Sequence, residues 1–451
     1  MAGTTMRRVV AAAATVTLAV AVAAPAATAG VRRGGQHTMR LPVPYATAKF
    51  DVRTNSYAFG QAPVFLPDGR VVFGKDFGTG LGIQVYRANR DGSDLTCLTC
   101  ELKSRSDNVP AVRPQGDWIL FHSWMGHDIT VGSAGYGGIG SELFVMRPDG
   151  SHVTKLYGLH EPQDGEGTDD YHAYWSPDGK RIVWAHFNGN FIDGGGQARW
   201  DIRVANFVVR HGTPMLTHVR IVRPDNGHWY ETQWWAPNGK GFLYTETYGS
   251  TDNTELFYCR LPATGMCHSQ RITDNAAWDE QAIFTPDMKD ILFMSSRARP
   301  GFYNTFSTIA ADLGLTTDLD NFLILAIFDL GFLQPIAQEA TDLYEYDMKT
   351  HSVRRLTFDG NQGWVTPEFT WDPSGRQLWW TENRIPPEDT VSFPIRVARQ
   401  LELLIEFVEH PDLKLSSVRD FGTLPIPIEQ RTRVAHFVGV SVPASYRAHY
   451  E

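Results

Sequence analysis

The sequence predicts an all-β protein: a β-propeller of about six four-stranded blades, with an apolar, helical insertion in blade five. The main observation is a repeated unit, in which an apolar strand is followed by a Pro-x-Gly turn and a second apolar strand. Each twisted sheet of this kind can bury its faces only against neighbouring sheets, so copies arranged around an axis form a propeller. The unit recurs six times, with its proline at Pro67, Pro114, Pro177, Pro237, Pro286 and Pro373.

The turn of each unit has a physical reason. Proline presets φ, and Asp-Gly or Asn-Gly supplies the positive φ that a tight hairpin turn needs. The copy at Pro286 has Met288 where the others have glycine. Several copies continue with a third and a fourth strand, as in residues 143–157 and 256–273, which predicts four strands in each blade.

The fifth unit carries the insertion, at about residues 300–340. Its segment 321–337 is strongly apolar but too short to span a bilayer. Three interpretations are open: a helical flap packed on the propeller, a lid over a ligand, or a surface for hydrophobic docking of a partner.

The segments Trp175-Ser176-Pro177-Asp178-Gly179-Lys180-Arg181-Ile182 and Phe293-Met294-Ser295-Ser296-Arg297 resemble the Pro-Asp-Gly repeats of TolB-like propellers. The resemblance covers about residues 60–385. Such repeats occur in periplasmic interaction proteins, in peptidase propeller domains and in oligogalacturonate lyases, so the resemblance implies a fold rather than one function. A prolyl-oligopeptidase type of peptidase is not expected, because the chain has no G-x-S-x-G elbow.

The N-terminal residues 1–29 have the features of a signal peptide. Arg7 and Arg8 precede an apolar run, and Ala27-Thr28-Ala29 is an A-x-A cleavage site, so the mature chain is expected to begin at Gly30. Sec export and twin-arginine export both remain open. We therefore expect a secreted protein without a transmembrane segment.

Residues 30–451 are predicted to form a single propeller domain, with 386–451 as a closure or cap segment. Two further strand candidates lie near the chain ends, at about 50–57 and 434–442. One terminus is expected to close the ring by completing a blade of the other, which would leave no free sheet edge.

The composition narrows the possible partners. The chain has 13 Trp, 41 Gly and 26 Pro residues, as expected for many short strands joined by tight turns. Its net charge is −9, and we find no cluster of Lys and Arg, which argues against a nucleic-acid partner. Four cysteines form two close pairs, Cys97 with Cys100 and Cys259 with Cys267, which predicts two local disulfides in an oxidising compartment.

A candidate site follows from propeller geometry. The start of each innermost strand and the end of the second strand lie on one face, because the two strands form an antiparallel hairpin. Polar residues from several blades would meet there, as a site for a small-molecule, carbohydrate or protein partner requires. The ligand-binding candidates are Tyr171, Gln233, Gln281, Arg297 and Glu368.

Three interpretations of this polar cluster are open. In the first, the residues only solvate the channel mouth. In the second, His122, His172 and His186, with a residue such as Gln233, hold a divalent metal, Mn, Zn or Ca. In the third, two carboxyls perform metal-free acid/base chemistry.

The metal arrangement resembles that of oligogalacturonate lyases. The carboxyl candidates are Glu231, Glu246, Glu280, Glu368 and Glu382. The residues assigned to catalysis are Glu231, Glu280 and His172. The predicted function is binding of a ligand or partner at the channel mouth, and the alternative is a metal-assisted lyase or hydrolase acting on an acidic polysaccharide.

Overall fold

The computed structural model describes the strands of the propeller and the turns that connect them. Twenty-five strands and one short 3₁₀ helix, Cys100–Leu102, lie in the described part of the chain. The described residues are 46–54, 63–75, 83–102, 104, 107–123, 125, 141–158, 167–189, 200–228, 230–247, 254–275, 277–297, 341–358, 364–365, 368–384 and 433–441.

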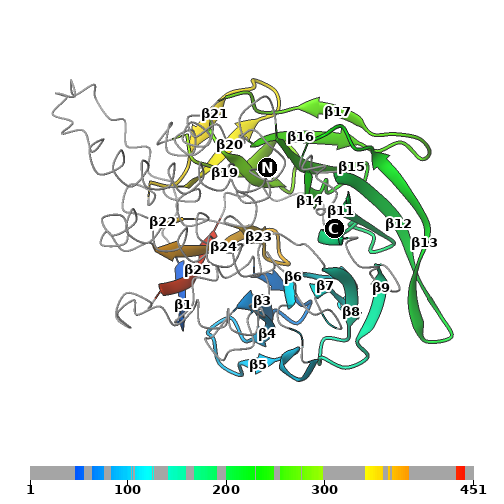
Figure 1. The fold of residues 1–451 in the computed structure, drawn as a ribbon. Coiled ribbons are helices and arrows are strands. Elements are labelled where there is room, and N and C mark those ends of the chain that lie inside the picture. Colours follow the sequence, from blue (N-terminus) through cyan, green and yellow to red (C-terminus); the bar gives the residue numbers. More distant parts are fainter. Residues whose placement is uncertain are drawn as a thin grey trace, which may run out of the picture. The chain divides into compact units, whose positions relative to one another are not determined.

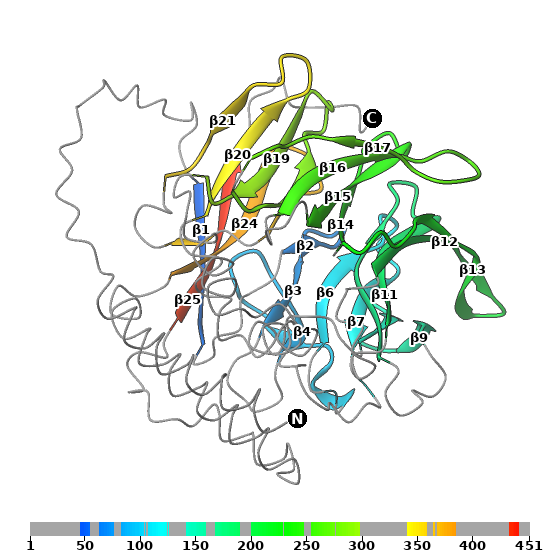
Figure 2. The same cartoon turned by 45° about the horizontal axis from the view of Figure 1, so that its top comes forward.

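Five antiparallel sheets have the predicted four-stranded form, each with its strands in chain order (Figure 1). The first strand of each sheet is an edge strand, and the first strands of successive sheets contact one another. The longest hairpin of these five sheets is β12–β13 in the third sheet (Figure 2). The five sheets are β2 (Val64–Phe65), β3 (Val71–Lys75), β4 (Gln84–Ala88), β5 (Thr96–Cys97); β6 (Asp107–Val112), β7 (Ile119–Ser123), β8 (Glu142–Met146), β9 (Thr154–Tyr157); β10 (Gly167–Trp175), β11 (Arg181–Gly189), β12 (Trp200–Arg210), β13 (Thr213–Arg223); β14 (Tyr230–Trp235), β15 (Gly241–Thr247), β16 (Thr254–Arg260), β17 (His268–Arg271); and β18 (Asp279–Phe284), β19 (Asp290–Ser295), β20 (Asp342–Asp347), β21 (Val353–Arg355).

A further sheet combines strands from both ends of the chain. It contains β22 (Trp364–Val365), β23 (Phe369–Trp371), β24 (Gln377–Arg384), β25 (Arg433–Ser441) and β1 (Ala46–Thr54). Strand β25 pairs with β24 on one side and with β1 on the other. The two terminal strand candidates are therefore strands, and they pair with each other. The structure gives five four-stranded blades and this mixed sheet, so six equivalent blades remain a prediction.

The turns of the repeats have the expected conformation. Gly179 and Gly239 have φ of 64° and 65°, and the amide of Gly239 donates to the carbonyl of Ala236 at 2.8 Å. Met288 adopts the same conformation with φ of 58°, and its amide donates to Thr285 in the same way. The turn survives without glycine because its hydrogen bonds are kept, at a strain cost of about 1 kcal/mol.

Tryptophans connect neighbouring sheets at the residue two before the repeat proline. Each donates its indole N–H to a backbone carbonyl of the preceding sheet: Trp175 to Ala111 at 3.0 Å, Trp235 to Tyr174 at 3.1 Å and Trp371 to Phe284 at 2.8 Å. These contacts explain why the chain repeats this aromatic residue, since a buried indole N–H needs an acceptor.

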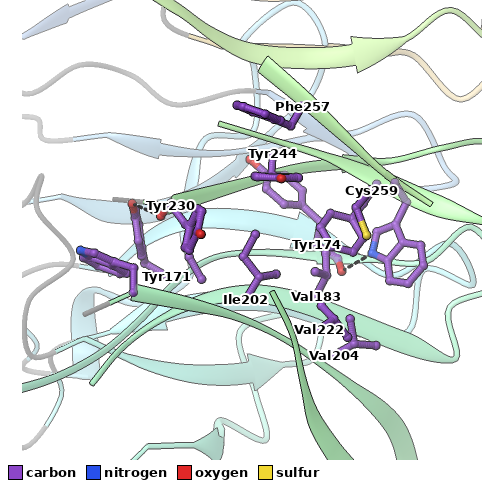
Figure 3. Close-up of a cluster of buried hydrophobic side chains, with 14 of the residues drawn as sticks. Tyr171, Tyr174, Val183, Ile202, Val204, Val222, Tyr230, Tyr244, Phe257 and Cys259 are labelled. Atoms are coloured by element: carbon purple, nitrogen blue, oxygen red, sulfur yellow. Dashed lines mark hydrogen bonds between the residues drawn. The ribbon is translucent and has the colours of Figure 1, made fainter. Parts of the chain in front are cut away.

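Apolar side chains fill the spaces between sheets. Figure 3 shows one such cluster, in which Tyr174 and Val183 of the third sheet pack with Tyr244 and Cys259 of the fourth. Alternate residues of each strand face the preceding and the following sheet, as the period of two requires. Burial on both faces is what a blade inside a ring needs.

The mixed sheet contacts the first blade as well as the fifth. Phe65 lies edge-on to Trp379 with ring centroids 5.3 Å apart, and the guanidinium of Arg90 lies 3.3 Å from the Asp372 carboxylate. On the other side, β18 contacts β23. The sheets thus follow one another as in a β-propeller, which confirms the predicted all-β propeller fold.

Both predicted disulfides are present, between Cys97 and Cys100 and between Cys259 and Cys267. The predicted helical insertion at 300–340, its apolar part 321–337 and most of the 386–451 segment lie outside the described residues. No helix within the described ranges is long and apolar enough to cross a membrane.

Candidate functional site

The candidate site is built from equivalent positions of the inner strands. Glu231 of β14 pairs with Thr245, and Glu280 of β18 pairs with Met294. Tyr171 occupies the matching position of β10, opposite Ala185. The pairing register shifts just after this position in β10 and β18, and one residue later, after Thr232, in β14. The two glutamates are therefore neighbours from adjacent blades, each beside a bulge.

The bulges bend the inner strands at the next residue. His172 and Gln281 both have φ of 48°, a left-handed conformation that is uncommon for residues other than glycine. Glu368 precedes β23 and stands five residues before its repeat proline, as His172 and Gln281 do. Three polar side chains thus come from one position of three sheets. Val109, five residues before Pro114, has the same left-handed conformation with φ of 43°, so the bend belongs to the repeat.

One carboxylate oxygen is the centre of the site. Glu231 Oε1 accepts hydrogen bonds from Gln233 Nε2 at 2.7 Å and from Gln281 Nε2 at 2.9 Å. His172 Nδ1 lies 3.0 Å from the same oxygen but is not aligned for a hydrogen bond. We call Glu231, Glu280, Glu368, His172, Gln233 and Gln281 the Glu231 cluster; all six side chains are buried.

Burial decides the protonation of the Glu231 cluster. It raises the pKa of Glu231 to about 8. It also raises the pKa of Glu280 well above its usual range, and the Glu231 carboxyl, to which Glu280 is hydrogen-bonded, adds to this rise. At neutral pH Glu231, with a pKa of about 8, is therefore mainly in its protonated form, and the raised pKa of Glu280 favours the protonated form of that carboxyl as well. Burial lowers the pKa of His172 to about 4, which keeps its imidazole neutral.

Sequence analysis missed one residue of this environment. Burial raises the pKa of Tyr174 well above its usual value, and the charges of Glu368, Glu231 and Glu280 add to the rise, which places the phenol near all three carboxyls. The Trp278 side chain also acts on the site, because it lowers the pKa of Glu280. Tyr174 could have been found, since it lies three residues after the selected Tyr171.

The predicted metal ligands lie in two environments. His122 of β7 is near the cluster, with its ring centroid 6.4 Å from those of Tyr171 and His172. His186 of β11 instead lies 2.7 Å from the Asp170 carboxylate, which also accepts a hydrogen bond from Trp184. In the described part of the chain, no three His, Cys, Asp or Glu side chains are placed to hold a metal ion. A metal held by the three imidazoles therefore stays a prediction.

Two other selected residues have their own partners. Arg297 Nη2 donates to Asp279 Oδ2 at 2.6 Å, and its guanidinium lies over the Phe293 ring, so it belongs to the packing of β18 and β19. Glu246 accepts hydrogen bonds from Arg223 and Asn226 and lies 2.7 Å from His228 Nδ1. The side chain of Glu382 lies outside the described residues.

Together, the sheets and this cluster define a β-propeller with a buried, acidic polar site on its inner strands. No family model and no curated protein matches the chain. Among solved structures, it resembles an oligogalacturonate lyase in complex with manganese, at 10% identity and a TM-score of 0.42 over 88% of this chain and 92% of that one.

Two further structures show a comparable likeness. The first is an oligogalacturonate lyase from Vibrio parahaemolyticus, at 9% identity and a TM-score of 0.38 over 88% of this chain and 92% of that one. The second is a puromycin-hydrolysing peptidase of Mycobacterium tuberculosis, at 11% identity and a TM-score of 0.41 over 76% of this chain and 44% of that one. A prolyl endopeptidase also matches, and the chain covers 40% of it. These values are too low to transfer an activity or a metal to this chain.

Proposed function

We propose that this chain is a ligand-binding β-propeller and that its ligand binds at the Glu231 cluster. The observation that carries the proposal is the convergence of polar side chains from three successive sheets on the Glu231 carboxyl. A protein that needed only a stable core could fill these inner-strand positions with apolar side chains, because burying a polar group costs free energy. Polar groups kept there at this cost are typical of a binding site.

The test is a thermal-shift screen of the mature protein at pH 7 with sugars, amino acids, amines and dicarboxylates. Any compound that raises the Tm is then titrated against Glu231→Gln and against a matched control, Glu345→Gln. Glu345 is a buried acid on β20 that accepts a hydrogen bond from Arg354 Nε at 2.8 Å. Losing a hydrogen bond to a charged group costs about 1.5–3 kcal/mol, so we expect Glu231→Gln to weaken binding roughly tenfold to a hundredfold.

Two results would contradict the proposal. The first is a ligand that binds wild type and Glu231→Gln equally well. The second is a screen in which no compound raises the Tm.

A second candidate is acid/base catalysis by the Glu231–Glu280 pair. Its support is the raised pKa of Glu231, because a carboxyl with a pKa near the working pH can both give and accept a proton. Turnover of the screened ligand, lost in both Glu231→Gln and Glu280→Gln, would favour this candidate over simple binding.

The metal-assisted alternative on an acidic polysaccharide fits the described residues less well. A uronate carboxylate would be repelled by the three glutamates of the cluster unless a cation lay between them. His172 Nδ1 and Glu231 Oε1 approach to 3.0 Å, but the described residues supply no third ligand of the usual kind at that place.

The proposal also covers the export of the protein and the number of its blades. We infer a secreted TolB-like propeller, supported by the signal-like residues 1–29 and by the two disulfides, which persist in oxidising compartments. We also infer that the mixed sheet acts as a sixth blade, since it contacts both the first and the fifth. N-terminal sequencing of the exported protein should begin at Gly30; an uncleaved N-terminus would contradict export.

A further inference from the structure

We propose that the Glu231 cluster binds an organic cation that carries ammonium groups. This inference rests on the proposed binding function and names its ligand class. It follows from three features of the cluster: its unused acceptors, its acidic charge and its geometry.

The first feature is a surplus of hydrogen-bond acceptors. Gln233 uses its amide N–H to bond Glu231, while its Oε1 is buried and has no hydrogen-bond partner among the described residues. The Gln233 side chain is fully buried, and its bond to Glu231 places the amide inside the cluster. His172 Nδ1 is likewise buried without a hydrogen-bond partner within the described ranges. A ligand that donates hydrogen bonds would satisfy both atoms.

The second feature is the charge. Three glutamates come together, and none of the inner-strand positions that form the cluster is a lysine or an arginine. Two arginines form ion pairs with carboxylates outside the cluster: Arg297 with Asp279, and Arg223 with Glu246. Burial keeps Glu231 and Glu280 protonated in the free protein, and a cation that binds beside them would favour their ionised form and replace those protons.

The third feature is the spacing, which favours an organic cation over a metal ion. The described acidic and imidazole side chains do not form a set that could close around one metal. An ammonium group needs no closed shell, because its three N–H donors can reach separate acceptors such as an amide oxygen, an imidazole nitrogen and a carboxylate. The Tyr174 ring adds an aromatic surface of the kind on which cations bind.

Cation binding should displace protons from Glu231 and Glu280. A cation favours the ionised form of both carboxyls, so affinity should rise as the pH rises through about 8, the pKa of Glu231. The titratable groups that face this pair are Glu368, which adds to the rise of the Glu280 pKa, His172, which stays neutral, and Tyr174, whose raised pKa keeps its phenol protonated.

The experiment is calorimetric titration of the mature chain with 1,4-diaminobutane, in phosphate and in MOPS at equal ionic strength between pH 6 and 9. The matched probes are neutral 1,4-butanediol, anionic succinate, and the chlorides of manganese and calcium. We expect saturable binding of the diamine, at least tenfold weaker in Glu231→Gln and Glu280→Gln and unchanged in Glu345→Gln. The heat should differ between the two buffers, because a proton is released.

Other outcomes separate the ligand class from the binding function. In one outcome the diamine does not bind, but the diol, succinate or a metal binds wild type and binds Glu231→Gln more weakly. The proposed cation class is then wrong, and the binding function stands. If no probe and no screened compound binds, both are wrong. Equal diamine binding by wild type and Glu231→Gln also overturns the inference. If Glu231→Gln loses its near-UV circular dichroism, and with it the native packing, Gln233→Met is tested instead. Gln233→Met removes the free amide oxygen and keeps the Glu231 carboxyl.

Discussion

Gln281 Nε2 donates a hydrogen bond to Glu231 Oε1 at 2.9 Å and so connects β18 to β14. The contact joins two blades through polar side chains, and apolar side chains pack between the same two sheets. The backbone at Gln281 is left-handed, with φ of 48°. Both the strain and the buried carboxyl cost stability, and this cost leads to measurable consequences.

The first consequence is a pH-dependent stability. The pKa of Glu231 is about 8 in the folded chain and 4.5 in an ordinary environment, so the folded state holds a proton that the unfolded state releases. Stability should therefore fall as the pH rises from about 4.5 to about 8, and Glu231→Gln should flatten this fall. Urea unfolding at several pH values measures the effect, with Glu345→Gln as the control. An unchanged slope in Glu231→Gln would contradict the assignment.

His172 should make the folded protein less stable at acidic pH. Its pKa is lowered to about 4 by burial, whereas an ordinary histidine titrates near 6.5. Stability should fall as the pH drops from about 6.5 to about 4, because only the unfolded state gains a proton there. His172→Gln should lose this acid sensitivity. The same urea series below pH 7 tests it, and a variant as acid-sensitive as wild type would contradict it.

Trp235 should stabilise the contact between the third and fourth blades. Its indole donates to the Tyr174 carbonyl at 3.1 Å, and the Arg181 guanidinium lies 4.7 Å from its ring centroid. Trp235→Phe removes the hydrogen bond and weakens the cation–π contact, so we expect a loss of about 1–2 kcal/mol. Trp234→Phe is the matched control and should cost less. Equal losses in denaturant unfolding would show that only ring size matters.

The two disulfides should differ in their effect. Cys259 and Cys267 are 8 residues apart, whereas Cys97 and Cys100 are 3 apart. A longer closed loop restricts the unfolded chain more. Replacing Cys259 and Cys267 by serine should therefore lower the free energy of unfolding more, on the order of 2–3 kcal/mol. Denaturant unfolding of the two double variants compares them. A larger loss for the Cys97–Cys100 pair would contradict the loop-length argument.

The repeat motif predicted much of the fold because each part of it has a local cause. Pro-Asp-Gly turns determine hairpins, and the aromatic residue two before the proline marks the contact with the preceding sheet. The same counting also separates the histidines. His122 is the eighth residue after Pro114, and His186 is the ninth after Pro177, so side-chain alternation puts them on opposite faces of their strands.

The centre of the site could not be predicted in the same way. The bulges at His172 and Gln281 depend on how two strands pair, and no glycine or other turn residue predicts them. The raised pKa of Glu231 depends on burial by side chains from other blades, which are distant in sequence. Glu231, Glu280, Gln233 and Gln281 were selected because inner strands must converge, but their hydrogen bonds required the structure.

The measurement that tests the central claim most directly is a carbon-13 NMR titration of glutamate side-chain carboxyls in the folded protein, with Glu231→Gln and Glu280→Gln spectra providing the assignment. Two buried carboxyls that interact should titrate in two separated steps, with Glu231 near pH 8. If both carboxyls titrate together near the ordinary value of 4.5, they are hydrated and independent, and the buried acidic site described here does not exist.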